Sequence, residues 1–337
     1  MASGSRGACV SGYVVIQRNP HSGTHRRSHV LLDLIAGLKK AGLKPRLFSN
    51  RSRLDEFVLR HQPAGDLVAM VAAGGDGTVD DLLNRHPELP LAILPLGTEN
   101  LLARYLGFRL DGIWLAKIIA QGHVREMDLA RANGRLFCTV ASAGFDASIV
   151  HDVHSRRSGH ANRWSYFFSF LRHLVSYRFP GMNVVVHSSR GVEKHSATQL
   201  FVSNVPRYAM QLPVGRGGDE ADGLLEVELI SISHIGALLW VLGWMFLGKP
   251  SGVRLQATEL MITSSQDAAV LFEVDGDPSG ETPMHLTISP RGLKLIDTRS
   301  AQSSKSAAAI PSDSSAAEPT APAGKLPEIA SLPVSGN

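Results

Sequence analysis

A glycine-rich turn, Gly74-Gly75-Asp76-Gly77-Thr78, carries residue types that bind phosphate groups. It follows the apolar run 66–73, which is typical of a buried strand, and the pattern after it predicts a helix. Closely spaced glycines let backbone N–H groups turn inward as an anion cradle, and the N-terminal end of a helix adds positive charge. Thr78 is expected to cap that helix with its hydroxyl. A carboxylate such as Asp76 beside phosphates indicates a nearby Mg²⁺ or a hydroxyl to be oriented.

Two more polar turns are predicted at strand ends. The segment Asn19-Pro20-His21-Ser22-Gly23 follows a strand expected over 13–17, and Gly97-Thr98-Glu99-Asn100 follows one expected over 91–94. Ligands of an open parallel sheet lie beyond the carboxyl ends of its strands, so the three turns together predict a phosphate-lined cleft. Each turn taken singly has a simpler interpretation as a tight turn, with Asp76 as a local acceptor. The chain has no GxxxxGK[ST] motif, which argues against a P-loop.

The elements that position these turns alternate between strand and helix over residues 10–124. Strands are expected over 13–17, 46–49, 66–73 and 91–94, and helices over 31–38, 54–59, 100–105 and 113–120. This alternation predicts an α/β fold with a doubly wound, mostly parallel sheet that forms a nucleotide-binding domain.

Strand-like runs dominate residues 125–298 and predict a second, β-rich, sandwich-like domain, with one strand expected over 137–141. Helical patterns interrupt it over 164–177 and 235–246, and the segment around His151 and His154 is expected to be a polar loop. Residues 299–337 are rich in Ala, Ser and Pro and contain no aromatic residue, so we expect a disordered tail.

Composition narrows the class of protein. The 337 residues suit two domains and a tail, and the net charge of +4 is a mild basic bias that fits an anionic partner such as ATP or a lipid headgroup surface. The two cysteines, Cys9 and Cys138, form no CxxC pair and give no support for a disulfide framework or a zinc knuckle. No apolar segment follows Met1 as a secretory signal would, so a reducing, cytoplasmic setting is expected.

Two segments raise the question of a membrane. The uncharged run 235–248 is shorter than the roughly 20 residues a bilayer requires, so a buried helix is expected, with a membrane-dipping helix as the alternative. Basic residues stand next to a run of aromatic residues over 163–173. That pattern is typical of a half-buried helix and also fits a helix at a lipid surface better than a nucleic-acid contact.

Five segments in this order resemble the catalytic domain of the diacylglycerol kinase family, which includes bacterial lipid kinases and sphingosine and ceramide kinases. They are NPHSG at 19–23, GGDGT at 74–78, PLGTEN at 95–100, DEADGLLE at 219–226 and VDGD at 274–277. NAD kinases and phosphofructokinases share similar GGDG cradles, whereas five segments in order are highly specific. The resemblance spans about residues 10–297 and implies that the last strands return to the first domain.

The resemblance implies a role for each motif. The nucleotide-binding residues that it implies are Asn19, Ser22, Gly23, Ser49, Gly74, Gly75, Asp76, Gly77, Thr78 and Thr98. Asp277 matches the acidic general base that takes the proton of the lipid hydroxyl, and Asp76 is assigned to catalysis with it. Asp219, Asp222 and the carbonyl of Leu224 match a structural Mg²⁺ site, with a solvated acidic loop as the alternative. VDGD also fits a simple hairpin turn.

The expected activity is therefore ATP-dependent phosphorylation of a hydroxyl on diacylglycerol or a related lipid, a sphingoid base or ceramide, with Mg²⁺. The expected partners are a lipid alcohol and the inner face of a membrane, without nucleic acid, and a homodimer fits the resemblance. Three positions depart from the family pattern: Asp277 replaces Glu, Asp80 stands where relatives often have Asn, and Leu101 where many have Asp. An NAD kinase-like enzyme and a weakly catalytic binding protein are the alternatives.

Overall fold

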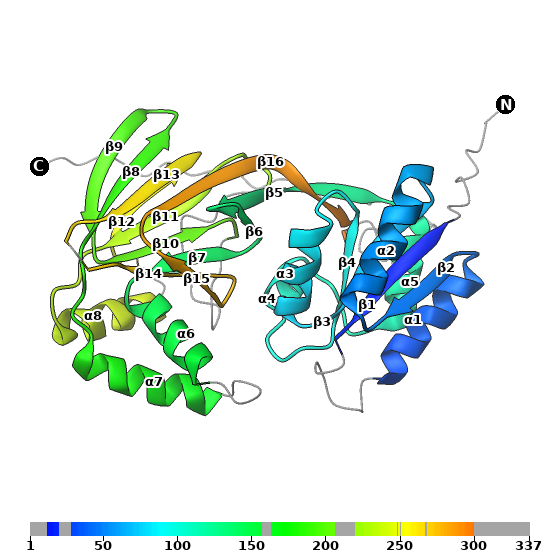
Figure 1. Cartoon of the computed structure of the whole chain (residues 1–337), viewed down its shortest axis with the longest axis horizontal. Helices are drawn as coiled ribbons and strands as arrows, with labels where there is room; N and C mark the ends of the chain where they lie inside the picture. Colours follow the sequence, from blue (N-terminus) through cyan, green and yellow to red (C-terminus); the bar gives the residue numbers. More distant parts are fainter. Residues whose placement is uncertain are drawn as a thin grey trace, which may run out of the picture.

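The computed structural model describes residues 12–19, 28–156, 163–205, 220–247, 249, 251–266 and 268–299. These residues form two lobes, which are joined along one side by the long strands β5 (Val124–Ala132) and β16 (Met284–Ile296), as Figure 1 shows. The N-terminal lobe alternates strands and helices and the C-terminal lobe is β-rich, which confirms the predicted fold class.

Four parallel strands form the centre of the N-terminal lobe in the order β2-β1-β3-β4. Their bounds are β1 Tyr13–Arg18, β2 Lys44–Phe48, β3 Leu67–Gly74 and β4 Leu91–Pro95. The helices of this lobe are α1 Ser28–Lys40, α2 Arg51–His61, α3 Asp76–Arg85, α4 Leu101–Tyr105 and α5 Gly112–Gln121. β3 is buried from Ala69 onward, which explains its uninterrupted apolar sequence.

Local signals set the ends of the helices that cover this sheet. Asn50 caps α2 by accepting a hydrogen bond from the backbone of Arg53 at 3.1 Å. Asp111 caps α5 in the same way, and Gly122 ends it with φ of 70°. Strand order reverses between β1 and β3, so the carboxyl ends of these two neighbours mark the switch point where such sheets bind ligands.

Strands β5 and β16 carry the sheet from one lobe into the other. They pair antiparallel from Leu286 with Ala132 to Ile296 with Val124, and Leu295 also pairs in parallel with Leu91 of β4. The result is one continuous ten-stranded sheet that includes β2, β1, β3 and β4 at one end and β13, β8 and β9 at the other. Backbone hydrogen bonds, and not a bare linker, therefore connect the two lobes.

The C-terminal lobe is a sandwich of this sheet with a second, six-stranded sheet. The strands that complete the lobe are β6 Arg135–Phe137, β7 Val140–Ala143, β8 Met182–Ser188, β9 Gly191–Ala197, β10 Gln199–Ser203, β11 Leu225–Ile230, β12 Val253–Ala257, β13 Glu259–Ser264, β14 Leu271–Val274 and β15 Asp277–Glu281. The second sheet has the order β12-β11-β10-β7-β14-β15. Phe137 and Phe272, both fully buried, fill the core between the sheets.

Three helices lie with the six-stranded sheet: α6 Phe145–Ser155, α7 Arg163–Ser176 and α8 Ile235–Phe246. A hydrophobic cluster holds them together, with Phe145, Phe201 and Leu238 at its centre. The expectation of a polar loop around His151 and His154 was wrong: both lie on α6, because Phe145, Val150 and Val153 supply a buried helical face beside them. Helix α8 is buried on one side only, since Leu238 and Val241 are covered while Leu239 and Trp240 are exposed.

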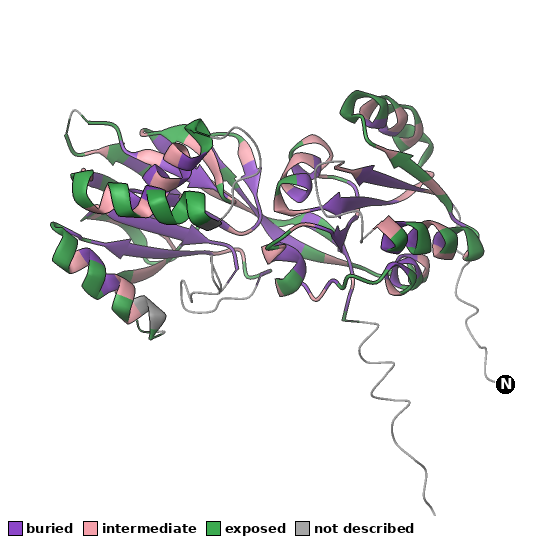
Figure 2. Cartoon of the chain, turned by 90° about the horizontal axis from the view of Figure 1, so that it is seen from below, coloured by how far each residue is buried: buried purple, intermediate pink, exposed green. Residues whose placement is uncertain are grey.

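Figure 2 shows this division of the surface, with buried strands behind helices whose outer faces are exposed. In the described part of the chain, none of the helices combines the length and the apolar character needed to cross a membrane.

Candidate functional site

Two of the predicted glycine turns are in direct contact at the carboxyl ends of β3 and β4. The backbone N–H groups of Leu96 and Gly97 both donate to the carbonyl of Gly74, at 2.9 and 3.1 Å. A Cβ on Gly97 would lie 2.5 Å from the Cα of Gly75, so the two turns can meet only through glycine. The side chain of Asn100 closes the second turn by donating to the Gly97 carbonyl at 2.8 Å and accepting its N–H at 3.0 Å.

Thr78 does not cap helix α3, contrary to expectation. The N-cap is Gly75, and Thr78 lies inside the first turn, where its N–H donates to the Gly75 carbonyl at 2.9 Å. Its hydroxyl packs against Gly74, where a Cβ would come within 2.1 Å of Oγ1. Within the described part of the chain this buried oxygen has no hydrogen-bond partner. Since a buried, unpaired hydroxyl is costly, the turn fits a bound polar group such as a phosphate oxygen.

The carboxylate of Asp76 lies at the start of α3 and faces the N-terminal end of α4. Burial raises its pKa to about 6. Backbone hydrogen bonds from Leu102, Leu101 and Asn100 act in the opposite direction, and the negative charge of Asp275 adds to the increase. Burying the ionised carboxylate of Asp76 therefore costs folding free energy, and such a cost is typical of a group that serves a ligand or a reaction.

The facing wall comes from the C-terminal lobe, at the turn between β14 and β15. The carboxylate of Asp275 accepts backbone hydrogen bonds from Cys138 at 3.0 Å, Thr139 at 2.9 Å and Val140 at 3.0 Å, and a further one from the Thr139 hydroxyl. Because these N–H groups bind Asp275, they cannot pair with a neighbouring strand. The single strand expected over 137–141 is therefore divided into β6 and β7. Asp275 and Gly276, at φ of 51° and 85°, form the turn itself.

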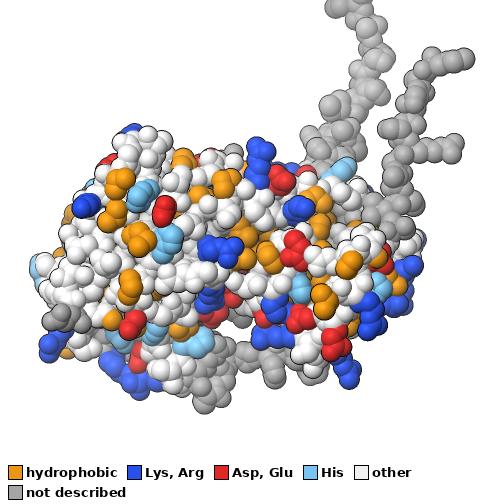
Figure 3. Space-filling view, turned by 45° about the horizontal axis from the view of Figure 1, so that its top comes forward, with side chains coloured by type: hydrophobic (Ala, Val, Ile, Leu, Met, Phe, Trp, Pro, Cys, Tyr) orange, Lys and Arg blue, Asp and Glu red, His pale blue; other side chains and the backbone are white. Residues whose placement is uncertain are grey.

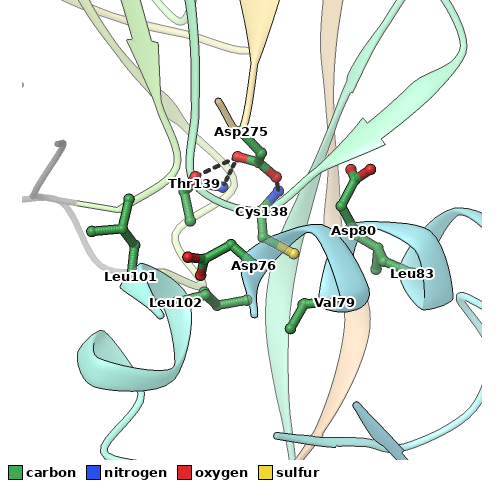
Figure 4. Close-up of a pocket in the computed structure, with 9 residues that line it drawn as sticks. All are labelled: Asp76, Val79, Asp80, Leu83, Leu101, Leu102, Cys138, Thr139 and Asp275. Atoms are coloured by element: carbon green, nitrogen blue, oxygen red, sulfur yellow. Dashed lines mark hydrogen bonds between the residues drawn. The ribbon is translucent and has the colours of Figure 1, made fainter. Parts of the chain in front are cut away.

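A cavity lies between these two walls, as Figure 4 shows. Its lining consists of Asp76, Val79, Asp80, Leu83, Leu101, Leu102, Cys138, Thr139 and Asp275. Six of these nine residues belong to the N-terminal lobe and three to the C-terminal lobe, so the cavity forms only where the lobes meet. Figure 3 shows a hollow between the lobes with acidic and basic side chains on its visible walls.

Asp80 is one helical turn from Asp76 and reaches the same cavity. Burial raises the pKa of Asp80 to about 6, while the guanidinium of Arg135 lowers it and the charges of Asp275 and Asp277 raise it further. Asp277 lies at the start of β15 with two fifths of its side chain exposed, and it forms an ion pair with Arg135 at 3.5 Å. Asp277 is not part of the cavity lining, whereas Asp275 is.

Three further residues that were predicted to bind the nucleotide, Asn19, Ser49 and Thr98, follow strands at the same edge of this sheet. Asn19 follows β1, and its N–H donates to the carbonyl of Ala73 on β3 at 3.4 Å. Thr98 is exposed on the turn that contains Gly97. Ser49 is also exposed, but it follows the outer strand β2, one strand further from the glycine turns than Asn19. Ser22 and Gly23 lie outside the described residues.

The predicted structural metal site is described only in part. Asp219 lies outside the described residues, while Asp222 accepts a hydrogen bond from the N–H of Leu224 at 2.9 Å. The following Gly223 donates to the buried carboxylate of Asp128 at 2.6 Å. Among the described residues there is no group of three or more His, Cys, Asp or Glu side chains that could hold a metal ion. The Mg²⁺ assignment to Asp219, Asp222 and Leu224 stays a prediction.

Comparison with known proteins follows the division into lobes. Residues 13–132 match the model of the diacylglycerol kinase catalytic domain, and residues 139–297 match that of the YegS C-terminal NAD kinase beta sandwich-like domain. The N-terminal lobe is therefore similar to the diacylglycerol kinase catalytic domain, and the C-terminal lobe to the YegS C-terminal domain. The predicted resemblance to this family is therefore confirmed.

Individual relatives are distant in sequence and similar in fold. Diacylglycerol kinases from Staphylococcus epidermidis and Staphylococcus carnosus are 23% and 24% identical over 274 residues, which cover 79% of this chain and 85% and 88% of theirs. A crystal structure of a diacylglycerol kinase from Bacillus anthracis aligns with a TM-score of 0.63 at 22% identity, covering 86% of this chain and 98% of that one. A second solved structure from that organism aligns with a TM-score of 0.68 at 20% identity, over 89% and 99%.

Several residues of the site were missed from the sequence. Thr139 and Cys138 carry no motif, and they enter the cavity because Asp275 binds their backbone N–H groups. Arg135 is an isolated arginine on β6, and nothing in its neighbourhood indicates that it meets Asp80. Asp275 belongs to the VDGD segment, so the signal for it was present but was assigned to Asp277 alone.

Proposed function

We propose that this protein is an ATP-dependent lipid kinase that transfers the γ-phosphoryl group of ATP to a hydroxyl of diacylglycerol or a related lipid. The observation that carries the proposal is the pair of touching glycine turns, at which the buried Thr78 hydroxyl has no partner within the described residues. Backbone N–H groups and a free hydroxyl at the start of a helix are the groups that bind nucleotide phosphates.

Each wall has a part in the proposed reaction. The turn at residues 74–78 holds the phosphates, and Asp76 faces them from the N-terminal lobe. The lipid hydroxyl enters from the C-terminal lobe, where Asp277 accepts its proton directly or through one water. The hydroxyl oxygen then forms a bond to the γ-phosphorus, the bond from that phosphorus to the bridging oxygen breaks, and ADP leaves. Mg²⁺ supplies positive charge to the phosphates, and the oxygens of Asp76 are of the type it prefers.

An NAD kinase-like activity is the second candidate, because the C-terminal lobe matches a domain model described as NAD kinase beta sandwich-like. The two candidates differ in the acceptor: a lipid hydroxyl in one and a ribose hydroxyl of NAD in the other. The nucleotide turns serve both, so an experiment must supply both acceptors to decide between them.

The deciding experiment incubates the full chain with γ-labelled ATP, Mg²⁺ and a total lipid extract, and then separates the lipids. We expect a labelled lipid that disappears in Asp76→Ala and Asp277→Ala. The exposed Asp33 on α1 supplies the matched control, Asp33→Ala, which keeps the label. Label in NAD but in no lipid would establish the alternative activity, and label in neither would favour a binding protein.

We also propose a membrane surface as the place where the lipid is met. Helices α7 and α8 expose large apolar side chains on the outside of the C-terminal lobe, among them Trp164, Phe168 and Trp240, at 67%, 61% and 59% (Figure 2). The same helices carry exposed cations: Arg172 on α7, and Lys249 after α8, whose Nζ lies over the ring of Trp244 at 4.2 Å. Interfacial aromatics beside cations suit an anionic bilayer. We expect Trp240→Ser to weaken sedimentation with anionic vesicles, and Val192→Ser, on the distant edge strand β9, to leave it unchanged.

A further inference from the structure

One arginine of the C-terminal lobe, Arg135, contacts both lobes beside Asp80, a residue of the cavity lining. Nη2 of Arg135 lies 3.0 Å from Oδ2 of Asp80 on α3 and 3.5 Å from Oδ2 of Asp277 on β15. Nη1 of the same side chain donates to the carbonyl of Pro278 at 3.4 Å. Arg135 therefore touches the backbone and the side chain of the β15 start, where the proposed base lies, and also a carboxylate of the opposite lobe.

The strand that carries Arg135 is itself fixed against the opposite lobe. The side chain of Asn84 on α3 pairs with the peptide of Leu136, accepting its N–H at 2.8 Å and donating to its carbonyl at 3.1 Å. Asn84 also donates to Oδ1 of Asp80 at 3.1 Å. Both oxygens of Asp80 are thus occupied, one by Asn84 and one by Arg135, and the guanidinium has a defined anchor.

The ion pair between Arg135 and Asp80 is largely buried, which strengthens it. The side chains of Asp80 and Arg135 are 16% and 26% exposed, so water screens their attraction only in part. The side chain of Asp277, the other partner of Arg135, is 40% exposed to solvent. Without a cation between them the carboxylates of Asp80 and Asp277 would repel each other, and Asp277 would turn away from Asp80.

We propose that Arg135 is a positioning residue, which Asp80 anchors from the N-terminal lobe and which holds the Asp277 carboxylate at the cleft. This inference rests on the proposed function for its catalytic meaning. It also accounts for two departures from the family pattern, because Asp in place of Asn at position 80 and Asp in place of Glu at position 277 meet at the same nitrogen. The carboxylate of Asp80 anchors the Arg135 guanidinium, and the guanidinium holds the shorter side chain of Asp277.

The test is a cycle of kinetic measurements on lipid phosphorylation. Asp80→Asn is expected to lower kcat about tenfold, with the KM for ATP little changed, because a displaced general base loses part of its contribution. In the Asp277→Glu background the same change is expected to cost less than about threefold, since a longer acid reaches the hydroxyl without the anchor. An equal factor in both backgrounds would overturn the inference.

Arg135 itself supplies a second arm. Arg135→Ala is expected to lower kcat by about a hundredfold, the loss that a displacement of about 1 Å causes at a reacting group, and Arg135→Lys to restore part of it. In the Arg135→Ala background, Asp80→Asn is expected to have no further effect on kcat. A merely structural role would instead lower the concentration of folded protein and leave kcat per folded molecule unchanged.

A readout without activity separates this inference from the proposed function. Arg135→Gln, Asp277→Asn and the double variant form a thermal-unfolding cycle, in which a real contact gives changes in Tm that depart from additivity by about 1 °C or more. If the wild-type protein labels no lipid, the proposed function is wrong, and the unfolding cycle still decides whether Arg135 holds Asp277. Additive changes in Tm would refute the contact.

Discussion

Replacing Asp76 by Asn is expected to make the folded protein more stable at neutral pH while it removes activity. The pKa of Asp76 is about 6 in the folded protein, against an ordinary value of 3.8 for an aspartate side chain. The difference of about two pKa units corresponds to about 3 kcal/mol at pH 7.5, since each unit is worth about 1.4 kcal/mol. Asn forms weaker backbone hydrogen bonds with the start of α4 than a carboxylate does, so we expect a gain of about 1–2 kcal/mol.

The pH dependence of this gain has a definite sign. Because the folded-state pKa of Asp76 is raised, the native protein binds the proton more tightly than the unfolded chain, and wild-type stability increases as the pH falls through about 6. The ionised form carries the cost, so Asp76→Asn gains most above pH 6 and almost nothing near pH 4. Activity is expected to fall over the same range, because the proposed role of Asp76 toward the phosphates and Mg²⁺ requires its ionised form.

Urea unfolding of wild type and Asp76→Asn at pH 7.5 and pH 4.5 measures both quantities, with Asp33→Asn as the control for a general change of charge. The lipid phosphorylation assay supplies the activity. A loss of stability at pH 7.5, or a gain that is equal at both pH values, would refute the reasoning that burial of the charge is the dominant cost. A stable variant without activity would show a group kept for function at the expense of stability.

Two further changes test how the lobes and turns are held. Glu220→Gln removes the partner of the largely buried Arg125, with which Glu220 forms an ion pair at 2.5 Å, so we expect a loss of about 2–4 kcal/mol in urea unfolding. Burial raises the pKa of Glu220, but hydrogen bonds from Tyr105 and Arg125 outweigh it and lower the pKa overall. The difference in stability between wild type and Glu220→Gln should therefore be largest above the ordinary pKa of a glutamate, and it should vanish as the pH falls through the lowered pKa of the folded protein. Gly97→Ala forces the turns apart and is expected to cost about 1–3 kcal/mol and to weaken ATP binding, measured by calorimetry. Gly77→Ala, with open space around its Cβ, is the matched stability control, and an equal loss there would contradict the packing argument.

Elements with a strong period were predictable from sequence. The apolar run that became β3 and the helical spacing that became α1 carry their own signal, because burial on both faces or on one face fixes the pattern. β5 was missed because the sequence VREMDLARA mixes charges with apolar residues, and its ladder with β16 spans about 150 residues of chain. Long-range pairing of this kind decides the strand, and no local pattern records it.

Some residues of the site could likewise be predicted from the sequence, and others could not. The glycine turns were predictable, since only glycine allows Gly74, Gly75 and Gly97 to approach as they do. The role of Thr78 was mistaken because a Thr after a glycine turn reads equally well as a cap or as a hydroxyl inside the first turn. The assignment of Asp275 could not be made from sequence, because its donors on residues 138–140 lie more than 130 positions away.

The shared sheet limits how the cleft can change its width. β5 and β16 pass from lobe to lobe as a paired ladder whose register breaks only between Ser289 and Leu293. At that break Arg291 has a φ of 55°, and its N–H donates to the buried carboxylate of Asp128 at 2.7 Å. The other oxygen of Asp128 accepts the N–H of Gly223, so the carboxylate ties the bulge to the segment that includes Asp222. Bending at this bulge would therefore move the segment around Asp222 together with it.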